Sequence, residues 1–258
     1  MPTRNLKNYN YNVNNTYQLQ PQIQQPQTQT IKHLFPHASN GNIVPINIRL
    51  AQPADIPFLA WVLYTAAQSH LAHCPWSIIF NETEARTRTL LEHITQNPSL
   101  PWSDVSNFWI ADADGKPAAA MCGFAPTTET PTDPVITELS IAKQVFHYSN
   151  EQLADIQKRI IIATFGFPDD IPNTWAIENV AVLPEYQGKG LIDLLFKHVL
   201  EEGRQKGFKQ VQILSLIGNE QGQRSFERNG FAVITQKVHP EFENLFGTPG
   251  AKLLVQDL

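Results

Sequence analysis

The stretch "VLPEYQGKGLIDLLFKHVL", residues 182–200, decides how this chain of 258 residues is interpreted. An apolar run, a turn with two glycines and an amphipathic helix follow one another in it. A strand that enters a helix through such a turn directs unpaired backbone N–H groups, and the positive end of the helix dipole, at one point. The pattern is typical of a phosphate site, where Gly188 and Gly190 let the backbone approach the ligand and Lys189 adds a charge.

Two common nucleotide motifs do not fit this turn. A Walker A loop needs Lys followed by Ser or Thr, but Lys189 precedes Gly190 and no suitably placed glycine comes before it. A dinucleotide fingerprint needs a third glycine, and that position holds Asp193.

The elements around the turn predict the fold class. Alternating apolar runs predict strands at 43–51, 173–182, 209–217, 231–238 and 251–258, and a hairpin at 107–126 whose runs meet at Asp114 and Gly115. Helical spacing predicts helices at 53–71, at 81–96 with a capping box from Asn81 to Glu84, from Ser149 to 165, at 190–207 and at 219–230. Strands and helices interleave without a repeat, which favours an α/β (α+β) domain on a mixed sheet.

The segment "IENVAVLPEYQGKGLIDLL", residues 177–195, together with "NEQGQRSFERNGF", residues 219–231, closely resembles the signature of the GNAT superfamily of acyl-CoA N-acyltransferases. The resemblance implies a mostly antiparallel central sheet flanked by helices, with acetyl-CoA as co-substrate and no metal. Specific motifs cover residues 174–231, and the element order to residue 258 is compatible with the same fold.

The resemblance also implies the residues that hold acetyl-CoA. The pantetheine arm would lie beside the strand 175–182, which splays from its neighbour, and the pyrophosphate would bind the amides of the glycine turn. Asn219 would contact the co-substrate beyond the thioester. The implied cofactor-binding residues are therefore Val180, Ala181, Val182, Gln187, Gly188, Lys189, Gly190, Leu191, Ile192 and Asn219.

Glu178 is the implied catalytic residue. Transfer needs a neutral amine, because an ammonium with a pKa of about 10.4 has no lone pair, and a nearby carboxylate can take its proton. Glu178 stands where many family members carry a glutamate. The alternative is that Glu178 only orients the acceptor or forms an ion pair.

The proton donor to the leaving thiolate is an open question. The family usually places a tyrosine four residues before the Gly-Phe pair, and this chain has Phe226 there, which cannot donate a proton. Tyr186, Ser225, Tyr148 or a water are the alternatives. The departure favours a second interpretation, a domain that binds acyl-CoA without catalysing transfer.

Composition separates the chain into two parts. Residues 1–42 are rich in Asn and Gln, interrupted by Pro, and are expected to be a disordered tail, while residues 43–258 are expected to form the GNAT-like acyltransferase domain. A third interpretation is an interaction protein that acts through this tail, because such tracts are prone to self-association.

Charge and cysteine content exclude several classes of protein. A net charge of −5 argues against a general nucleic-acid or membrane-surface binder, and no apolar run reaches transmembrane length. Two cysteines imply no disulfide framework, so a cytoplasmic setting is expected. His70, His73 and Cys74 have ligand-like spacing, but no second pair follows at the separation of a zinc site, so no metal is expected.

The acceptor is expected to be a small-molecule or peptide amine. The Pro-rich segment from Ala125 to Pro172 is longer than a bare scaffold needs, and its length predicts that it forms a wall of the acceptor site. The sequence leaves the acceptor, the acyl chain and the oligomeric state open.

Overall fold

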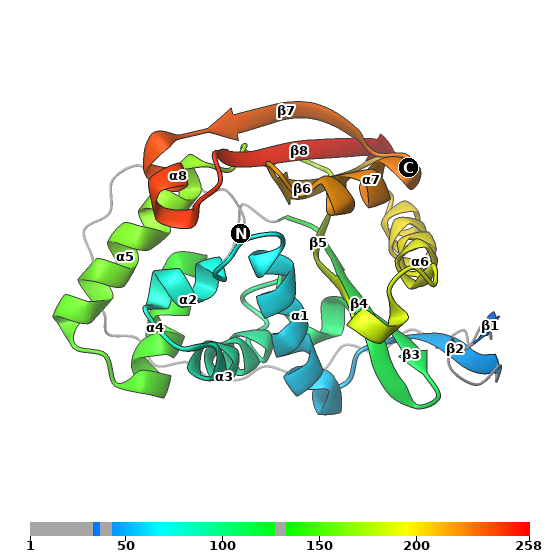
Figure 1. Cartoon of the computed structure of the whole chain (residues 1–258), viewed down its shortest axis with the longest axis horizontal. Coiled ribbons are helices and arrows are strands. Elements are labelled where there is room, and N and C mark those ends of the chain that lie inside the picture. Colours follow the sequence, from blue (N-terminus) through cyan, green and yellow to red (C-terminus); the bar gives the residue numbers. More distant parts are fainter. Residues whose placement is uncertain (1–32, 37–42, 127–132) are drawn as a thin grey trace.

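A mixed sheet runs through the protein, whose computed structural model describes residues 33–36, 43–126 and 133–258. The described strands form one eight-stranded sheet in the order β1-β2-β3-β4-β5-β6-β8-β7 (Figure 1). The strands are β1 His33–Pro36, β2 Ile43–Leu50, β3 Phe108–Ala113, β4 Lys116–Phe124, β5 Trp175–Val182, β6 Gln210–Leu216, β7 Ala232–Val238 and β8 Gly250–Asp257.

Helices cover both faces of this sheet. The α-helices are α1 Ile56–Gln68, α2 Pro75–Phe80, α3 Glu84–Thr95, α4 Pro134–Phe146, α5 Asn150–Phe165, α6 Leu191–Gln205, α7 Glu220–Arg228 and α8 Pro240–Phe246. Three short 3-10 turns, Pro53–Asp55, Val105–Asn107 and Pro184–Tyr186, complete the described elements. Within the described ranges, no helix is long and apolar enough to cross a membrane.

Strand pairing confirms the expected fold class. Neighbouring strands pair antiparallel throughout the sheet. The exception is β5 with β6, which run parallel. A parallel pair requires a crossover, and α6 provides it between the end of β5 and the start of β6.

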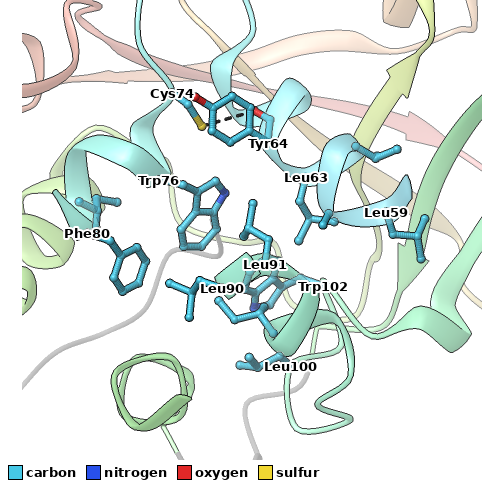
Figure 2. Packing of buried hydrophobic residues seen from close by; sticks show 14 of the residues in the cluster. Leu59, Leu63, Tyr64, Cys74, Trp76, Phe80, Leu90, Leu91, Leu100 and Trp102 are labelled. Carbon is cyan, nitrogen blue, oxygen red and sulfur yellow. Dashed lines mark hydrogen bonds between the residues drawn. The ribbon is translucent and has the colours of Figure 1, made fainter. Parts of the chain in front are cut away.

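Two buried clusters lie on opposite faces of the sheet. One, here called the α6 cluster, joins α6 to β3, β4, β5 and β6 and includes Trp175, Phe196 and Phe226. The other, here called the helical cluster, joins the sheet to α1, α2, α3, α5 and α8. Figure 2 shows part of the helical cluster, where Trp76 stacks with Phe80 and with Trp102 at centroid distances of 6.0 and 5.5 Å.

Helix α6 approaches the sheet closely because β4 carries a glycine there. A Cβ added to Gly123 would lie 2.6 Å from Cγ1 of Val199 on α6 and 3.0 Å from Nε1 of Trp175. The buried contact therefore depends on the absence of a side chain at position 123.

An ion-pair network ties the first strands together. The Arg49 guanidinium donates two hydrogen bonds to Asp55, at 2.7 and 2.9 Å, and one to Asp112 at 3.1 Å. Both carboxylates are buried. Burial alone would raise the pKa of Asp55, but the hydrogen bonds from Arg49 and from the Gln52 N–H outweigh it and hold that pKa below its usual value.

Most local predictions are confirmed. The β3–β4 hairpin turns at Asp114 and Gly115 with φ of 53° and 80°, and Ser149 forms a capping box with Gln152. The prediction that Asn81 caps the second helix is wrong. Asn81 ends α2 in the left-handed region, and Thr83 caps α3 by accepting a hydrogen bond from the Arg86 N–H.

The sequence does not predict three of the helices. Helices α2 and α8, with six and seven residues, are too short for a periodic pattern, and α4, with 13 residues, lies within the Pro-rich segment, where no element is predicted. Within the expected tail, His33–Pro36 form β1, which pairs antiparallel with β2. The rest of the expected tail, residues 1–32 and 37–42, lies outside the described residues.

Candidate active site

The site is built on a gap between two strands of the sheet. The register of β5 with β6 consists of three pairs, Trp175↔Val211, Ala176↔Gln212 and Ile177↔Ile213. Beyond them β5 continues to Val182 alongside β4, and β6 continues to Leu216 alongside β8. Figure 1 shows β4 and β5 turning away from β6, β8 and β7 at this point. The facing edges of residues 179–182 and 214–216 are therefore not paired with each other, and a ligand can lie between them.

A bulge in β5 sits at the start of this gap. Cys122 of β4 pairs with Glu178 and Ala120 pairs with Ala181, so Asn179 and Val180 together oppose one residue of β4. Asn179 adopts a φ of 53°, and its Nδ2 donates a 2.8 Å hydrogen bond to the Trp102 carbonyl. The bulge changes the direction of β5 immediately after Glu178.

The glycine turn follows the open end of β5. Gly188 and Gly190 both have a φ of 72°, and a Cβ added to either would have no atom within 4 Å. Gly190 is the N-cap of α6. The backbone N–H groups of the first turn of that helix therefore point out beyond its N-terminus, on the side of the glycine turn. The Lys189 ammonium lies 4.9 Å from the Tyr186 ring centroid, which holds it at the turn.

Helix α7 fixes the start of α6. Asp193 accepts hydrogen bonds from Arg228 at 3.0 Å and from Asn229 at 2.8 Å. Burial opposes ionisation of Asp193, but these two donors outweigh it and lower its pKa. The residue that breaks the dinucleotide fingerprint therefore has a structural partner.

A cavity of about 140 Å³ opens between the diverging strands and the helices. Three sequence-predicted residues, Glu178, Val180 and Asn219, line it together. The Asn219 side chain also caps α7 by accepting a hydrogen bond from the Gly222 N–H at 3.0 Å. The residues that line the cavity are Ala66, Ala67, Ser69, Leu71, Pro75, Trp76, Trp102, Ala163, Phe167, Ile177, Glu178, Asn179, Val180, Ile213, Leu214, Ser215, Leu216, Asn219, Phe226, Phe242 and Phe246.

The remaining predicted residues lie along the same edge, outside this lining. Ala181 and Val182 continue β5, and residues 187–192 form the turn and the start of α6. Leu191 is buried in the α6 cluster, and Ile192 packs against it.

Comparison with known proteins identifies this arrangement. The family model described as "Acetyltransferase (GNAT) family" matches residues 72–231. The chain belongs to the GNAT family of acetyltransferases.

Solved structures agree on the GNAT fold. An N-acetyltransferase from Staphylococcus aureus Mu50 superposes with a TM-score of 0.54 at 14% identity, covering 81% of this chain and 98% of its own. The protein named SsHAT superposes with a TM-score of 0.53 at 14% identity, covering 82% of this chain and 98% of its own. A protein described as an acetyltransferase superposes with a TM-score of 0.51 at 16% identity, covering 81% of this chain and 98% of its own. A search of curated proteins gave no significant match.

The predicted catalytic residue, Glu178, is half-buried at the cavity. Its neighbour across the sheet, Cys122, is fully buried, and burial together with the charge of Glu178 raises the pKa of that thiol. Cys122 is therefore an inert core residue, whereas Glu178 is in contact with the cavity.

Phe226, where the resemblance implies a tyrosine, lines the cavity with its ring against Phe196 and Phe231. The three alternative hydroxyls do not line it. Tyr148 donates a hydrogen bond instead to Glu82 at 2.7 Å. Its burial, and to a lesser extent that hydrogen bond, raise the pKa of Tyr148. Tyr186 lies in the 3-10 turn after β5, and Ser225 accepts a hydrogen bond from Arg228.

Several cavity residues could not be identified from the sequence. Ser215 lines the cavity, and its buried hydroxyl has no hydrogen-bond partner among the described residues. Its only signal is a lone polar residue in the apolar run "ILSLI", residues 213–217. The segment from Ala125 to Pro172 contributes Ala163 and Phe167 to the lining, so part of it does form a wall of this cavity. Residues 127–132 of that segment lie outside the described residues.

Metal binding at the His70, His73 and Cys74 positions has no support from the described residues. The described residues contain no cluster of three or more His, Cys, Asp or Glu side chains that could hold a metal ion. Cys74 donates instead to the Tyr64 carbonyl, and burial raises the pKa of Cys74 to about 12.

Proposed function

We propose that this protein is an N-acetyltransferase that transfers the acetyl group of acetyl-CoA to a primary amine. The observation that carries the proposal is the gap between β5 and β6, which opens after Ile177 and ends at the glycine turn. A pantetheine arm has amide groups along its length that match the open edge of a strand. A pyrophosphate matches the amides and the dipole at the N-terminus of α6.

The residues present fit this co-substrate. Among the described residues, no atom lies within 4 Å of a Cβ added at Gly188 or Gly190, and the Ser215 hydroxyl at the cavity has no hydrogen-bond partner. Val180, Ala181 and Val182 would bind the arm. Residues 187–192 would bind the pyrophosphate, and Asn219 would contact the region beyond the thioester.

Glu178 would act as the general base. The amine nitrogen bonds to the acyl carbon as the carbon–sulfur bond breaks, and the proton lost by nitrogen passes to Glu178, directly or through water. Coenzyme A leaves as the thiolate and takes a proton from water, because Phe226 has none to give. A thiol with a pKa near 8.5 leaves adequately in this way.

Calorimetric titration with acetyl-CoA tests the binding site. The variant Gly190→Glu places a carboxylate in the turn, and Gly190→Gln is its matched control, since both side chains share the unfavourable φ of 72°. We expect Gly190→Glu to bind at least about tenfold more weakly than Gly190→Gln, because like charges repel at this short range. Equal affinities of the two variants would count against a pyrophosphate at the turn.

Phe226 favours a second candidate function, acyl-CoA binding without transfer. Amine-dependent release of free thiol from acetyl-CoA separates the two functions. For the enzyme, Glu178→Gln should lower kcat by about 100-fold or more and leave acetyl-CoA affinity unchanged. Binding without any amine-dependent thiol release would favour the non-catalytic domain.

A further inference from the structure

The described lining of the cavity contains one ionisable side chain. Among the described residues that line it, Glu178 is the only Asp, Glu, Lys, Arg or His. An acceptor with a single ammonium group finds a partner in Glu178. A second charge of either sign on the acceptor would be desolvated without a partner, at a cost of several kcal/mol.

The walls on the Glu178 side are aromatic. Cys122, the sheet partner of Glu178, belongs to the helical cluster, so Glu178 is on the same face of the sheet as that cluster. Trp76 and Trp102 stack there at 5.5 Å and an interplanar angle of 12° (Figure 2). Phe242 packs against Phe167 at 5.5 Å and against Phe246 at 4.8 Å, and all five rings line the cavity.

These aromatic walls are deeply buried. Trp76, Trp102, Phe242 and Phe246 are 3%, 2%, 1% and 5% exposed. Walls of this kind surround a compact body, whereas an extended peptide needs an open groove with partners for its backbone.

We propose that the acceptor is a small primary monoamine with an aromatic or other apolar body and no second charge. Its amine nitrogen lies at Glu178, and its body lies among the indole and phenyl rings of the helical cluster. The inference rests on the proposed acetyl transfer, and it excludes free amino acids, diamines and polyamines as preferred acceptors.

Matched pairs of acceptors test each part of the inference with the wild-type protein and acetyl-CoA. 2-Phenylethylamine and phenylalanine differ by one carboxylate, and pentylamine and 1,5-diaminopentane differ by one ammonium group. We expect kcat/KM to be at least about 100-fold higher for the monoamine in each pair, because the described lining of the cavity holds no charged partner for the second charge. Calorimetric titration with 2-phenylethylamine in the presence of coenzyme A gives a readout independent of turnover, and its affinity should fall in Glu178→Gln.

A variant with a second carboxylate tests the charge argument directly. Ala66, at the end of α1, lines the cavity and is half-buried. Ala66→Asp should raise the kcat/KM ratio of 1,5-diaminopentane to pentylamine about fivefold, the effect of a partly exposed ion pair. Ala66→Asn, of nearly equal size and without charge, should leave the ratio unchanged.

The outcomes are distinct from those for the proposed function. If the wild-type protein does not bind acetyl-CoA, both the proposed acetyl transfer and the monoamine inference are overturned. Acetyl-CoA binding combined with a preference for phenylalanine, for the diamine or for a peptide with an apolar first residue would overturn the monoamine inference alone. If the protein binds acetyl-CoA but transfers no acetyl group to 2-phenylethylamine or to pentylamine, the monoamine inference is likewise overturned.

Discussion

Asn179 links the stability of the sheet to the position of Glu178, so two substitutions there should separate backbone effects from hydrogen bonding. The residue adopts a φ of 53° at the bulge and donates a 2.8 Å hydrogen bond to the Trp102 carbonyl. Asn179→Gly removes the hydrogen bond but permits the backbone conformation. Asn179→Ala removes the hydrogen bond and also strains the backbone.

The two losses can be estimated separately. The lost hydrogen bond leaves the Trp102 carbonyl without this partner and costs about 1.5 kcal/mol of unfolding free energy. Glycine also gives the unfolded chain more conformational freedom, which lowers the unfolding free energy of Asn179→Gly by about 0.7 kcal/mol more, for a total loss of about 2 kcal/mol. The left-handed conformation costs the alanine variant about 1.5 kcal/mol, for about 3 kcal/mol in total.

Urea denaturation measures both values, and kcat of acetyl transfer measures the effect on Glu178. Because the bulge follows Glu178 directly, we expect kcat to fall in both variants and to fall further for alanine. Equal unfolding free energies of the two variants would refute the argument from φ. A kcat equal to that of the wild type in a destabilised variant would show that the bulge does not position Glu178.

Three further substitutions test other parts of the structure. Asp55→Asn should lower the unfolding free energy by about 2 kcal/mol at pH 7, since the hydrogen bonds it weakens involve a charged carboxylate. The pKa of Asp55 is lowered by folding, so this stabilisation is complete above its ordinary pKa of 3.8 and is lost as the pH falls through the folded value; denaturation curves of the two proteins should converge in acid. Gly123→Ala should cost about 1–3 kcal/mol by overpacking, because its Cβ would lie 2.6 Å from Val199. In the Val199→Ala background the same change should cost less in urea denaturation, and an equal cost would exclude that contact as the cause. Phe226→Tyr should raise the rate of thiol release at low pH more than at high pH if the new hydroxyl reaches the thiolate, and an unchanged pH–rate profile would exclude such a role.

The predictable features are those encoded over a short stretch of chain. The glycine turn, the strand before it and the helix after it depend on neighbouring residues, and a capping box such as Ser149 with Gln152 spans one helical turn. The predicted cap at Asn81 is wrong because Thr83, two residues later, can cap the same helix and does so. A strong local pattern therefore gives the element more reliably than its exact boundary.

The rest of the site depends on residues far apart in the sequence. The divergence of β5 and β6 is set by which strands each of them pairs with beyond Ile177, and no sequence pattern reports that. Phe242 and Phe246 come from a seven-residue helix whose pattern is too short to detect. The aromatic wall could not be assembled from the sequence, because its rings come from α2, from the segments after α3 and α5, and from α8.

The short contact between β5 and β6 has a consequence for how the sheet withstands denaturation. Strands β1 to β5 form one hydrogen-bonded group and β6 to β8 another, and three residue pairs join the two groups within the sheet. A molecule that binds along both open edges adds cross-links at this weakest join, and its binding free energy adds to that of the fold. Such a molecule should therefore make the two parts of the sheet unfold more cooperatively.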